Sequence, residues 1–346
     1  MGLIRAAAVT DLHVIVPEGI DDPARPSGGN TYDRRVCDEL AAFGWSVRKR
    51  VALDLPRQLA RIPDGAVVLL DGLVASPAPE VLVPEARRLR QVVLVHMPFE
   101  DERERAVLEA AAAVVTTSEW TRRRLEDLYG LSDVQVAEPG VDVAALAPGS
   151  ADGGALLCVA AVTRGKGHDV LLGGLAAVPD LSWRCACVGS LDKAPAFADH
   201  VQRRALTFGL RDRVRFTGPR VGAALDSAYA AADLLVLASR GETYGMVVTE
   251  ALARGVPVLA TDVGGVPEAL GHGGLLVPPG DPEAFGAALR RWLEDADLRD
   301  ALRQAARERR ATLRGWEDTA SDVDTALMAA ARPALAAAPM PSEAAA

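Results

Sequence analysis

Residues 233–254 read DLLVLASRGETYGMVVTEALAR. The apolar run at its beginning predicts a strand that is buried on both faces, as strands of parallel sheets are. A glycine-containing loop follows, and apolar residues then recur at helical spacing as far as Gly255, a residue type that commonly ends helices. This pattern places Glu242 in the loop at the carboxyl end of a strand, and Glu250 about two turns along the next helix.

The rest of the chain continues the alternation of strands and helices, which is typical of parallel sheets covered by helices. The stretch 139–154 interrupts it, because this stretch is rich in Pro, Gly and small residues and has little periodicity. We therefore expect two α/β halves that are joined by a linker and face each other across a cleft. The strands expected before the linker are 5–16, 46–51, 66–70, 91–95, 113–117 and 134–138, and those after it are 155–161, 183–188, 213–217, 233–238 and 256–261.

The length of 346 residues agrees with two domains, since domains of about 150 residues are common. We set the first domain at 1–145 and the second at 146–315. A helical segment follows at 316–331. The remaining segment, 332–346, is of low complexity, and we expect it to be disordered.

Composition and charge exclude several classes of function. The chain has 38 Lys and Arg against 47 Asp and Glu, and its net charge of −9 argues against binding to nucleic acid or to an anionic membrane. No apolar run reaches the roughly 18 residues of a membrane span, and we see no signal peptide at the N-terminus. The four cysteines show no metal-binding spacing, and we expect buried thiols in a cytoplasmic protein. The oligomeric state stays open.

The two acids of the opening stretch indicate a ligand with a sugar at each end. The helix that begins near Gly245, Met246 and Val247 would aim backbone N–H groups at a phosphate. A carboxylate suits paired sugar hydroxyls, because it offers two oxygens with several lone pairs. Glu242 and Glu250 on either side of a diphosphate therefore suggest a nucleotide sugar. The alternative is that Glu242 only favours the helix dipole and Glu250 lies on an exposed face, although the apolar neighbours of Glu250 argue against exposure.

The stretch resembles the E-x7-E signature of retaining, family-4-like glycosyltransferases, which have the GT-B fold of two Rossmann-like domains. Further similarities run through most of the chain. They are GGN at 28–30, PGVD at 139–142, KGHDVLL at 166–172, AADLLVLAS at 231–239 and EALARGVPVLATDVGGVPE at 250–268. The resemblance implies the GT-B fold, with the helix at 316–331 crossing back to the first domain.

The resemblance also implies roles for the two acids and the helix start. Glu242 would contact the transferred sugar and Glu250 the ribose of the nucleotide. Gly245, Met246 and Val247 would supply backbone N–H groups to the donor.

Four further positions complete the predicted site. Lys166 follows a buried strand and suits a point charge on a phosphate. The Arg that usually precedes this Lys in the family is replaced by Ala161, and Arg164 is the substitute that we expect to reach the diphosphate. The resemblance places His96 near the donor sugar, although a lone His at a strand end is more often structural. It places Gly28 and Gly29 across the cleft, beside the acceptor, where glycine allows close approach of backbone.

The predicted activity is the retaining transfer of a hexose from a UDP-, GDP- or ADP-sugar to a small acceptor. The sequence shows no acid pair suited to a divalent metal, and we expect the transfer to need neither a metal nor a cofactor. Two alternatives remain open: an epimerase that acts on a nucleotide sugar, and a protein that binds a nucleotide sugar without turnover.

Overall fold

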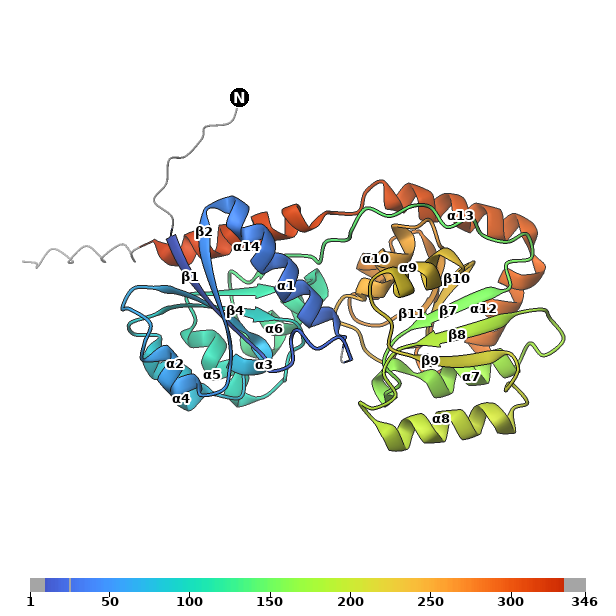
Figure 1. Cartoon of the computed structure of the whole chain (residues 1–346), viewed down its shortest axis with the longest axis horizontal. Helices are drawn as coiled ribbons and strands as arrows, with labels where there is room; N and C mark the ends of the chain where they lie inside the picture. Colours follow the sequence, from blue (N-terminus) through green and yellow to red (C-terminus); the bar gives the residue numbers. More distant parts are fainter. Residues whose placement is uncertain (1–9, 25, 333–346) are drawn as a thin grey trace, which may run out of the picture.

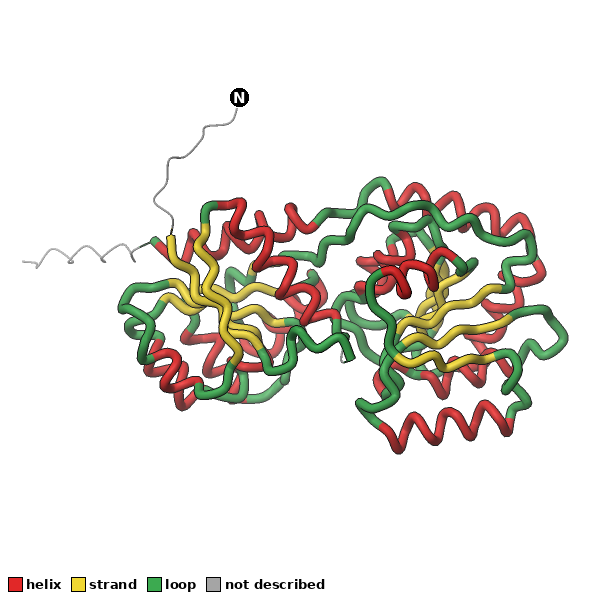
Figure 2. The backbone as a smooth tube through the Cα atoms, in the orientation of Figure 1, coloured by secondary structure: helices red, strands yellow, loops and turns green. Residues whose placement is uncertain are grey.

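The structure is a computed structural model that describes residues 10–24 and 26–332. It consists of two α/β halves side by side, each built on a six-stranded parallel sheet (Figure 1). Helices lie on both faces of each sheet, and one long and one short loop connect the halves (Figure 2). The prediction of two parallel-sheet halves is confirmed.

The first sheet has the strand order β2-β1-β3-β4-β5-β6, and every pair in it is parallel. The order reverses between β1 and β3, so loops that leave these two strands diverge and open a crevice at their carboxyl ends. The strands are β1 (Thr10–Val16), β2 (Trp45–Val51), β3 (Val67–Asp71), β4 (Arg90–Val95), β5 (Ala113–Thr116) and β6 (Gln135–Val136).

The second sheet has the strand order β12-β11-β10-β7-β8-β9, again with parallel pairs throughout. Its order reverses between β7 and β10, which is the switch point where doubly wound sheets bind ligands. The strands are β7 (Ala155–Val159), β8 (Arg184–Val188), β9 (Val214–Gly218), β10 (Leu234–Leu237), β11 (Val258–Thr261) and β12 (Gly274–Val277).

Two separate apolar layers cover the first sheet. Side chains of β1, β3 and β4 alternate between them, as the two-residue period of a strand requires. One layer packs on α1 (Gly28–Leu40) and α14 (Trp316–Ala331), and the other on the remaining helices. These are α2 (Leu55–Leu59), α3 (Gly72–Ala75), α4 (Pro79–Glu85), α5 (Glu102–Ala110) and α6 (Glu119–Tyr129), and a short 3-10 turn, Ala41–Phe43, follows α1.

The second sheet is covered in the same way. One face packs mainly on α7 (His168–Ala176), α8 (Pro195–Thr207) and α12 (Pro282–Glu294). The other face packs on α9 (Ala223–Ala230), α10 (Met246–Leu252) and α11 (Val266–Leu270), while α13 (Ala296–Arg310) contributes to both layers. The buried thiols of Cys158, Cys185 and Cys187 lie in the first of these layers.

The chain crosses between the halves twice, and the two crossings touch. Residues 137–154 contain no helix or strand and run from the first half to the second. The return crossing leads into α14, which lies against α1 of the first half (Figure 1). A Cβ at Gly140 would lie 2.5 Å from the backbone N of Trp316, so only glycine permits this approach. Val141 N–H also donates to the carbonyl of Arg314 at 3.0 Å.

The observed elements depart from the expected ones at a few places. The structure has a sixth strand in the second sheet, β12, which the sequence analysis missed. The expected strand 5–16 is described only from Thr10, and its first part lies outside the described residues, as does most of the segment 332–346. Within the part of the chain that the structure describes, no helix combines the length and apolarity needed to cross a membrane.

Candidate functional site

Lys166 and Glu242 meet at the switch point of the second sheet. Lys166 ends the 3-10 turn Arg164–Lys166, which follows β7, and Glu242 lies in the loop after β10. The Lys166 Nζ lies 2.6 Å from Glu242 Oε1, and the two side chains are only 33% and 10% exposed. Since β7 and β10 are the neighbours between which the strand order reverses, this pair lies where a doubly wound sheet binds its ligand.

The loop that carries Glu242 is fixed from three sides. Ser239 Oγ donates to Glu242 Oε1 at 2.8 Å, and Thr261 Oγ1 donates to the carbonyl of Ser239 at 2.5 Å. Gly265 N–H donates to the carbonyl of Glu242 at 3.1 Å. Both the backbone and the carboxylate of this loop are therefore held before any ligand binds.

Glu250 lies in α10 as a partly buried side chain with a defined partner. Tyr229 of α9 donates its hydroxyl hydrogen to Glu250 Oε2 at 2.6 Å. Burial raises the pKa of Glu250, although the hydrogen bond from Tyr229 and the nearby charge of Arg254 work against this rise. The side chain is neither free in solvent nor unpartnered, and Oε1 is the oxygen that has no hydrogen-bond partner among the described residues.

Glu250→Gln is expected to stabilise the unliganded protein more at pH 8 than at pH 4.5. The carboxyl pKa is raised in the folded state, so its favourable contribution is present at low pH and is lost as the pH rises through the folded value. Glutamine does not titrate and still accepts from Tyr229. Urea unfolding of both proteins at the two pH values measures the difference, with the exposed Glu283→Gln as control. An equal difference at both pH values would contradict the expectation.

The start of α1 brings the first half against the start of α10 in the second half. The loop that precedes α10, residues 238–245, carries Glu242 and is called the donor loop because of its predicted role. A Cβ at Gly28 would lie 3.1 Å from the sulfur of Met246, the first residue of α10. A Cβ at Gly29 would lie 3.3 Å from the Cδ2 of His96. Gly29 therefore lies next to His96 within the first half, and Gly28 lies next to Met246 of the second half. These are four of the residues that the sequence analysis predicted for the site. Val247 is partly buried beside Met246, and Gly245 caps the helix with a φ of 95°.

His96 is paired with two acids that the sequence analysis did not single out. It follows β4, and its Nε2 lies 2.8 Å from Asp33 Oδ1 and 3.7 Å from Asp71 Oδ2. Asp33 lies on α1 and Asp71 ends β3, so both come from elements next to the crevice of the first sheet. An acid at the end of the apolar run VVLLD was the one signal that could have marked Asp71.

Arg164 is not part of the group formed by Lys166 and Glu242. Its guanidinium lies over the ring of Phe197, 5.5 Å from the centroid, which is a cation–π geometry. Its carbonyl accepts from Arg240, and Arg240 is itself paired with Asp169 at 2.7 Å. The expected contact of Arg164 with a diphosphate stays a prediction.

A polar contact between the halves fixes the other side of the donor loop. Ser118 Oγ, which precedes α6, donates to the carbonyl of Thr243 at 2.6 Å. Glu268 of α11 accepts from the N–H of Glu119 at 3.0 Å and pairs with Arg123 at 2.9 Å. Movement of the halves relative to each other would therefore displace Thr243, the residue next to Glu242.

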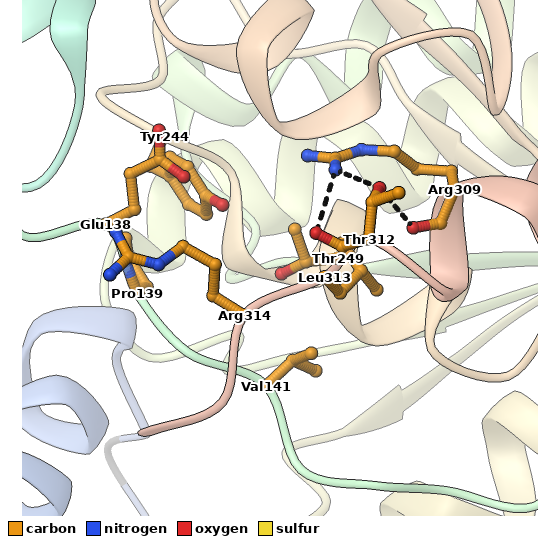
Figure 3. Close-up of a pocket in the computed structure, with 9 residues that line it drawn as sticks. All are labelled: Glu138, Pro139, Val141, Tyr244, Thr249, Arg309, Thr312, Leu313 and Arg314. Atoms are coloured by element: carbon orange, nitrogen blue, oxygen red, sulfur yellow. Dashed lines mark hydrogen bonds between the residues drawn. The ribbon is translucent and has the colours of Figure 1, made fainter. Parts of the chain in front are cut away.

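A cavity of about 100 Å³ lies where the chain crosses between the halves (Figure 3). Both crossings, the donor loop and α10 contribute to its walls: Glu138, Pro139, Val141, Tyr244, Thr249, Arg309, Thr312, Leu313 and Arg314. Its two arginines are already engaged, Arg309 with Thr312 Oγ1 at 2.8 Å and Arg314 with Asp322 at 2.8 Å. The cavity borders both crossings between the halves, and the predicted donor residues do not line it.

Two groups among the described residues have side chains of metal-ligand type: Asp33, Asp71 and His96, described above, and a cluster in the core of the second half. The ligand atoms of Cys158, His168 and Cys187 lie within 4.8 Å of one another, and all three residues are buried. Hydrogen bonding to Cys187 and burial raise the pKa of the Cys158 thiol, whereas a metal needs the thiolate. The expectation that transfer needs no metal stays a prediction.

Comparisons with known proteins found a family model, curated relatives and solved structures that are similar to this chain. Residues 153–295 match the family model described as "Glycosyl transferases group 1". A "D-inositol 3-phosphate glycosyltransferase" of Jonesia denitrificans is 33% identical over 244 residues, which are 64% of this chain and 57% of the relative. One of Kineococcus radiotolerans is 34% identical over 248 residues, 63% of this chain and 57% of the relative. The chain spans little more than half the length of these relatives.

Solved structures share the fold over nearly the whole chain. Sucrose-phosphate synthase from Thermosynechococcus elongatus superposes with a TM-score of 0.76 at 24% identity, and covers 91% of this chain and 98% of its own. Anabaena HepE in complex with UDP and glucose gives 0.76 at 18% identity, covering 92% and 99%. The GT-B prediction is confirmed. Residues 153–295, which carry Lys166, Glu242 and Glu250, match the glycosyl transferases group 1 family within a chain of GT-B fold.

Proposed function

We propose that the protein is a retaining glycosyltransferase that moves a hexose from a nucleotide-diphosphate sugar to a small acceptor. The observation that carries this proposal is the contact between Lys166 and Glu242 at the switch point of the second sheet, 2.6 Å long. It gives a cation for a diphosphate and a carboxylate for a sugar at one position. The family match of residues 153–295 and the names of the relatives support the same class of activity.

The donor would replace the contact between the two side chains with contacts of its own. Lys166 would turn to the diphosphate, and Glu242, still held by Ser239, would accept from sugar hydroxyls. Glu250 would accept from the ribose through Oε1, while Tyr229 holds its other oxygen. Each carboxylate would then keep one protein partner and offer its remaining lone pairs to the ligand.

The reaction breaks the bond between C1 of the sugar and the diphosphate oxygen and forms one between C1 and the acceptor oxygen. Retention follows when the acceptor attacks from the face that the diphosphate leaves, and the acceptor proton then passes to the leaving phosphate. Lys166 would stabilise the negative charge that grows there. Contact between Gly28 and Met246 would keep water out of the site once both substrates are bound.

The donor nucleotide can be found by thermal unfolding with UDP, GDP or ADP. A ligand present at 100 times its Kd stabilises a protein by about 2.7 kcal/mol, and UDP is the first to test because HepE was solved with UDP and glucose. We expect one nucleoside diphosphate to raise the unfolding temperature, and Glu250→Gln to reduce this rise. No rise with any of the three would contradict the proposal.

Turnover separates the proposed function from its two alternatives. Radiolabelled nucleotide sugars are incubated with candidate acceptors, beginning with the D-inositol 3-phosphate that the relatives' names supply. A new glycoside with the donor's anomeric configuration supports the proposal. An isomer of the donor alone indicates an epimerase, and binding without either product indicates a binding protein.

A further inference from the structure

The first half contains two buried carboxylates with a single cationic partner. Asp33 and Asp71 are 4% and 3% exposed. Among the ion pairs of the described residues, each of them is paired with His96 alone. No arginine or lysine of the described chain forms an ion pair with either acid, although the chain has 38 such residues in all.

Among the described residues, the contacts around the two acids include no other group that could balance their negative charge. Asp71 Oδ1 accepts from the N–H of Leu73 at 2.6 Å, and Asp33 Oδ2 is buried without a hydrogen-bond partner. A cavity of about 10 Å³ borders both acids and is otherwise lined mainly by apolar side chains. Such a space holds about one water. Burying carboxylate charge without a partner is costly, so the charge balance of this site depends on the imidazole.

We propose that Asp33 and Asp71 hold His96 as an imidazolium, with Nε2–H donated to Asp33 Oδ1, Asp71 adding its charge from 3.7 Å, and Nδ1–H left for the donor substrate. The first half would then add a fixed positive charge to the nucleotide-sugar site. This inference rests on the proposed function and deepens it, because it assigns Asp33 and Asp71 as positioning residues. His96 Nδ1 has no hydrogen-bond partner among the described residues, so it is available to a ligand.

The placement of the ring brings this charge close to the second half. A Cβ at Gly29 would lie 3.3 Å from the ring at Cδ2, and one at the neighbouring Gly28 would lie 3.1 Å from the sulfur of Met246 at the start of α10. The charged or titratable groups that face the ring are Asp33 and Tyr32 from α1 and Asp71 from β3, with the Tyr32 ring 5.0 Å away edge-on. Among the described residues, no arginine or lysine therefore competes with His96 for the two carboxylates.

The electrostatics of the three groups agree with this assignment. Burial works to lower the pKa of His96, but the charge and hydrogen bond of Asp33 and the charge of Asp71 outweigh it, and the net pKa is raised. Burial and the nearby charge of Asp33 raise the pKa of Asp71 to about 7, against the lowering effect of His96. The group thus retains protons near neutral pH and releases them as the pH rises.

An NMR titration of the protein labelled at histidine Cε1 tests the protonation of His96 without any substrate. The exposed His200 gives a reference signal in the same spectrum, and His96→Gln assigns the signal of interest. We expect His96 to titrate above the ordinary value of about 6.5. In Asp33→Asn the midpoint should fall by about one unit or more, since an opposite charge this close shifts a pKa by about 1–3 units. Asp71→Asn should lower it less, because Asp71 is farther from Nε2.

Kinetics then show whether the charge is used. Asp33→Asn and Asp71→Asn should lower kcat and kcat/KM together by about tenfold or more, as loss of a contact made in the transition state does. Both asparagines can still accept from the imidazole, so a purely structural role would leave kcat unchanged even though the midpoint of His96 falls. Asp64→Asn, an exposed acid of the first half paired with Arg88, is the matched control and should behave as wild type.

Two failures can be distinguished. If His96 of the wild type titrates at or below the reference, or if neither asparagine variant moves its midpoint, the inference is overturned whatever the activity. If the titration moves as expected while kcat stays unchanged, the use of the charge in catalysis is overturned. Absence of any nucleotide-sugar turnover in the wild type would contradict the proposed function, and the NMR result would still report on the three side chains.

Discussion

Lys166→Ala is expected to lower kcat/KM for sugar transfer by about 10²–10³-fold, the usual cost of removing one group that stabilises charge in a transition state. The leaving diphosphate gains negative charge as the bond to C1 breaks, and Lys166 is the cation that the structure places beside Glu242. Steady-state kinetics with the donor found by thermal unfolding measure the loss. Lys166→Arg should lose less, because it keeps the charge but changes its geometry.

Lys49→Ala is the matched control, since Lys49 lies on β2 and, among the described residues, forms an ion pair with Asp21 alone. Wild-type kcat/KM in Lys166→Ala would refute the role of this residue.

Glu242→Ala is expected to cut transfer as strongly while leaving the fold intact. The double variant should lose less than the product of the two single losses, because each side chain also positions the other through the 2.6 Å contact.

Gly264→Ala is expected to displace the loop that carries Glu242 and so to lower both the stability of the protein and its activity. A Cβ at Gly264 would lie 1.6 Å from the carbonyl oxygen of Glu242, and the φ of this glycine is +56°. A side chain in that conformation costs about 1–2 kcal/mol, and the overlap also forces the donor loop to move. Since a shift of about 1 Å in an active site can cost on the order of 10²-fold in rate, both the unfolding temperature and kcat/KM should fall.

Gly241→Ala provides the comparison for stability. Gly241 belongs to the same loop, but a Cβ there would meet nothing within 4 Å, and its φ is not positive. Its unfolding temperature should therefore stay close to that of the wild type. If the two variants unfold alike, the close packing of Gly264 on Glu242 does not hold the loop.

The part of the fold that sequence could predict is the part with strong local patterns. The run LLVL and the helix after it were recognisable because a buried parallel strand is apolar throughout. The cleft position of Glu242 then followed from topology, since loops after such strands meet at one edge of the sheet. β12 was missed because Gly274–Val277 has four residues and only three apolar side chains, too few to show a period.

The partners of the predicted residues could not be read from the sequence. Asp33 and His96 are 63 residues apart, and Tyr229 precedes Glu250 by 21. Their pairing depends on which elements lie side by side, and local pattern does not determine that. Arg164 shows the same limit, because its guanidinium could be placed near Lys166 by spacing but lies over Phe197 in the structure.

The return of α14 to the first half has a consequence for synthesis on the ribosome. Domains generally fold as they emerge, from the N-terminus onward. Here Trp316, Val323 and Leu327 complete the apolar layer between the first sheet and α1. Until these residues have been synthesised, that layer of the first half stays exposed to water. The second half contains every strand and helix of its own layers between Ala155 and Arg310. We therefore expect the half that is translated later to reach its native packing earlier.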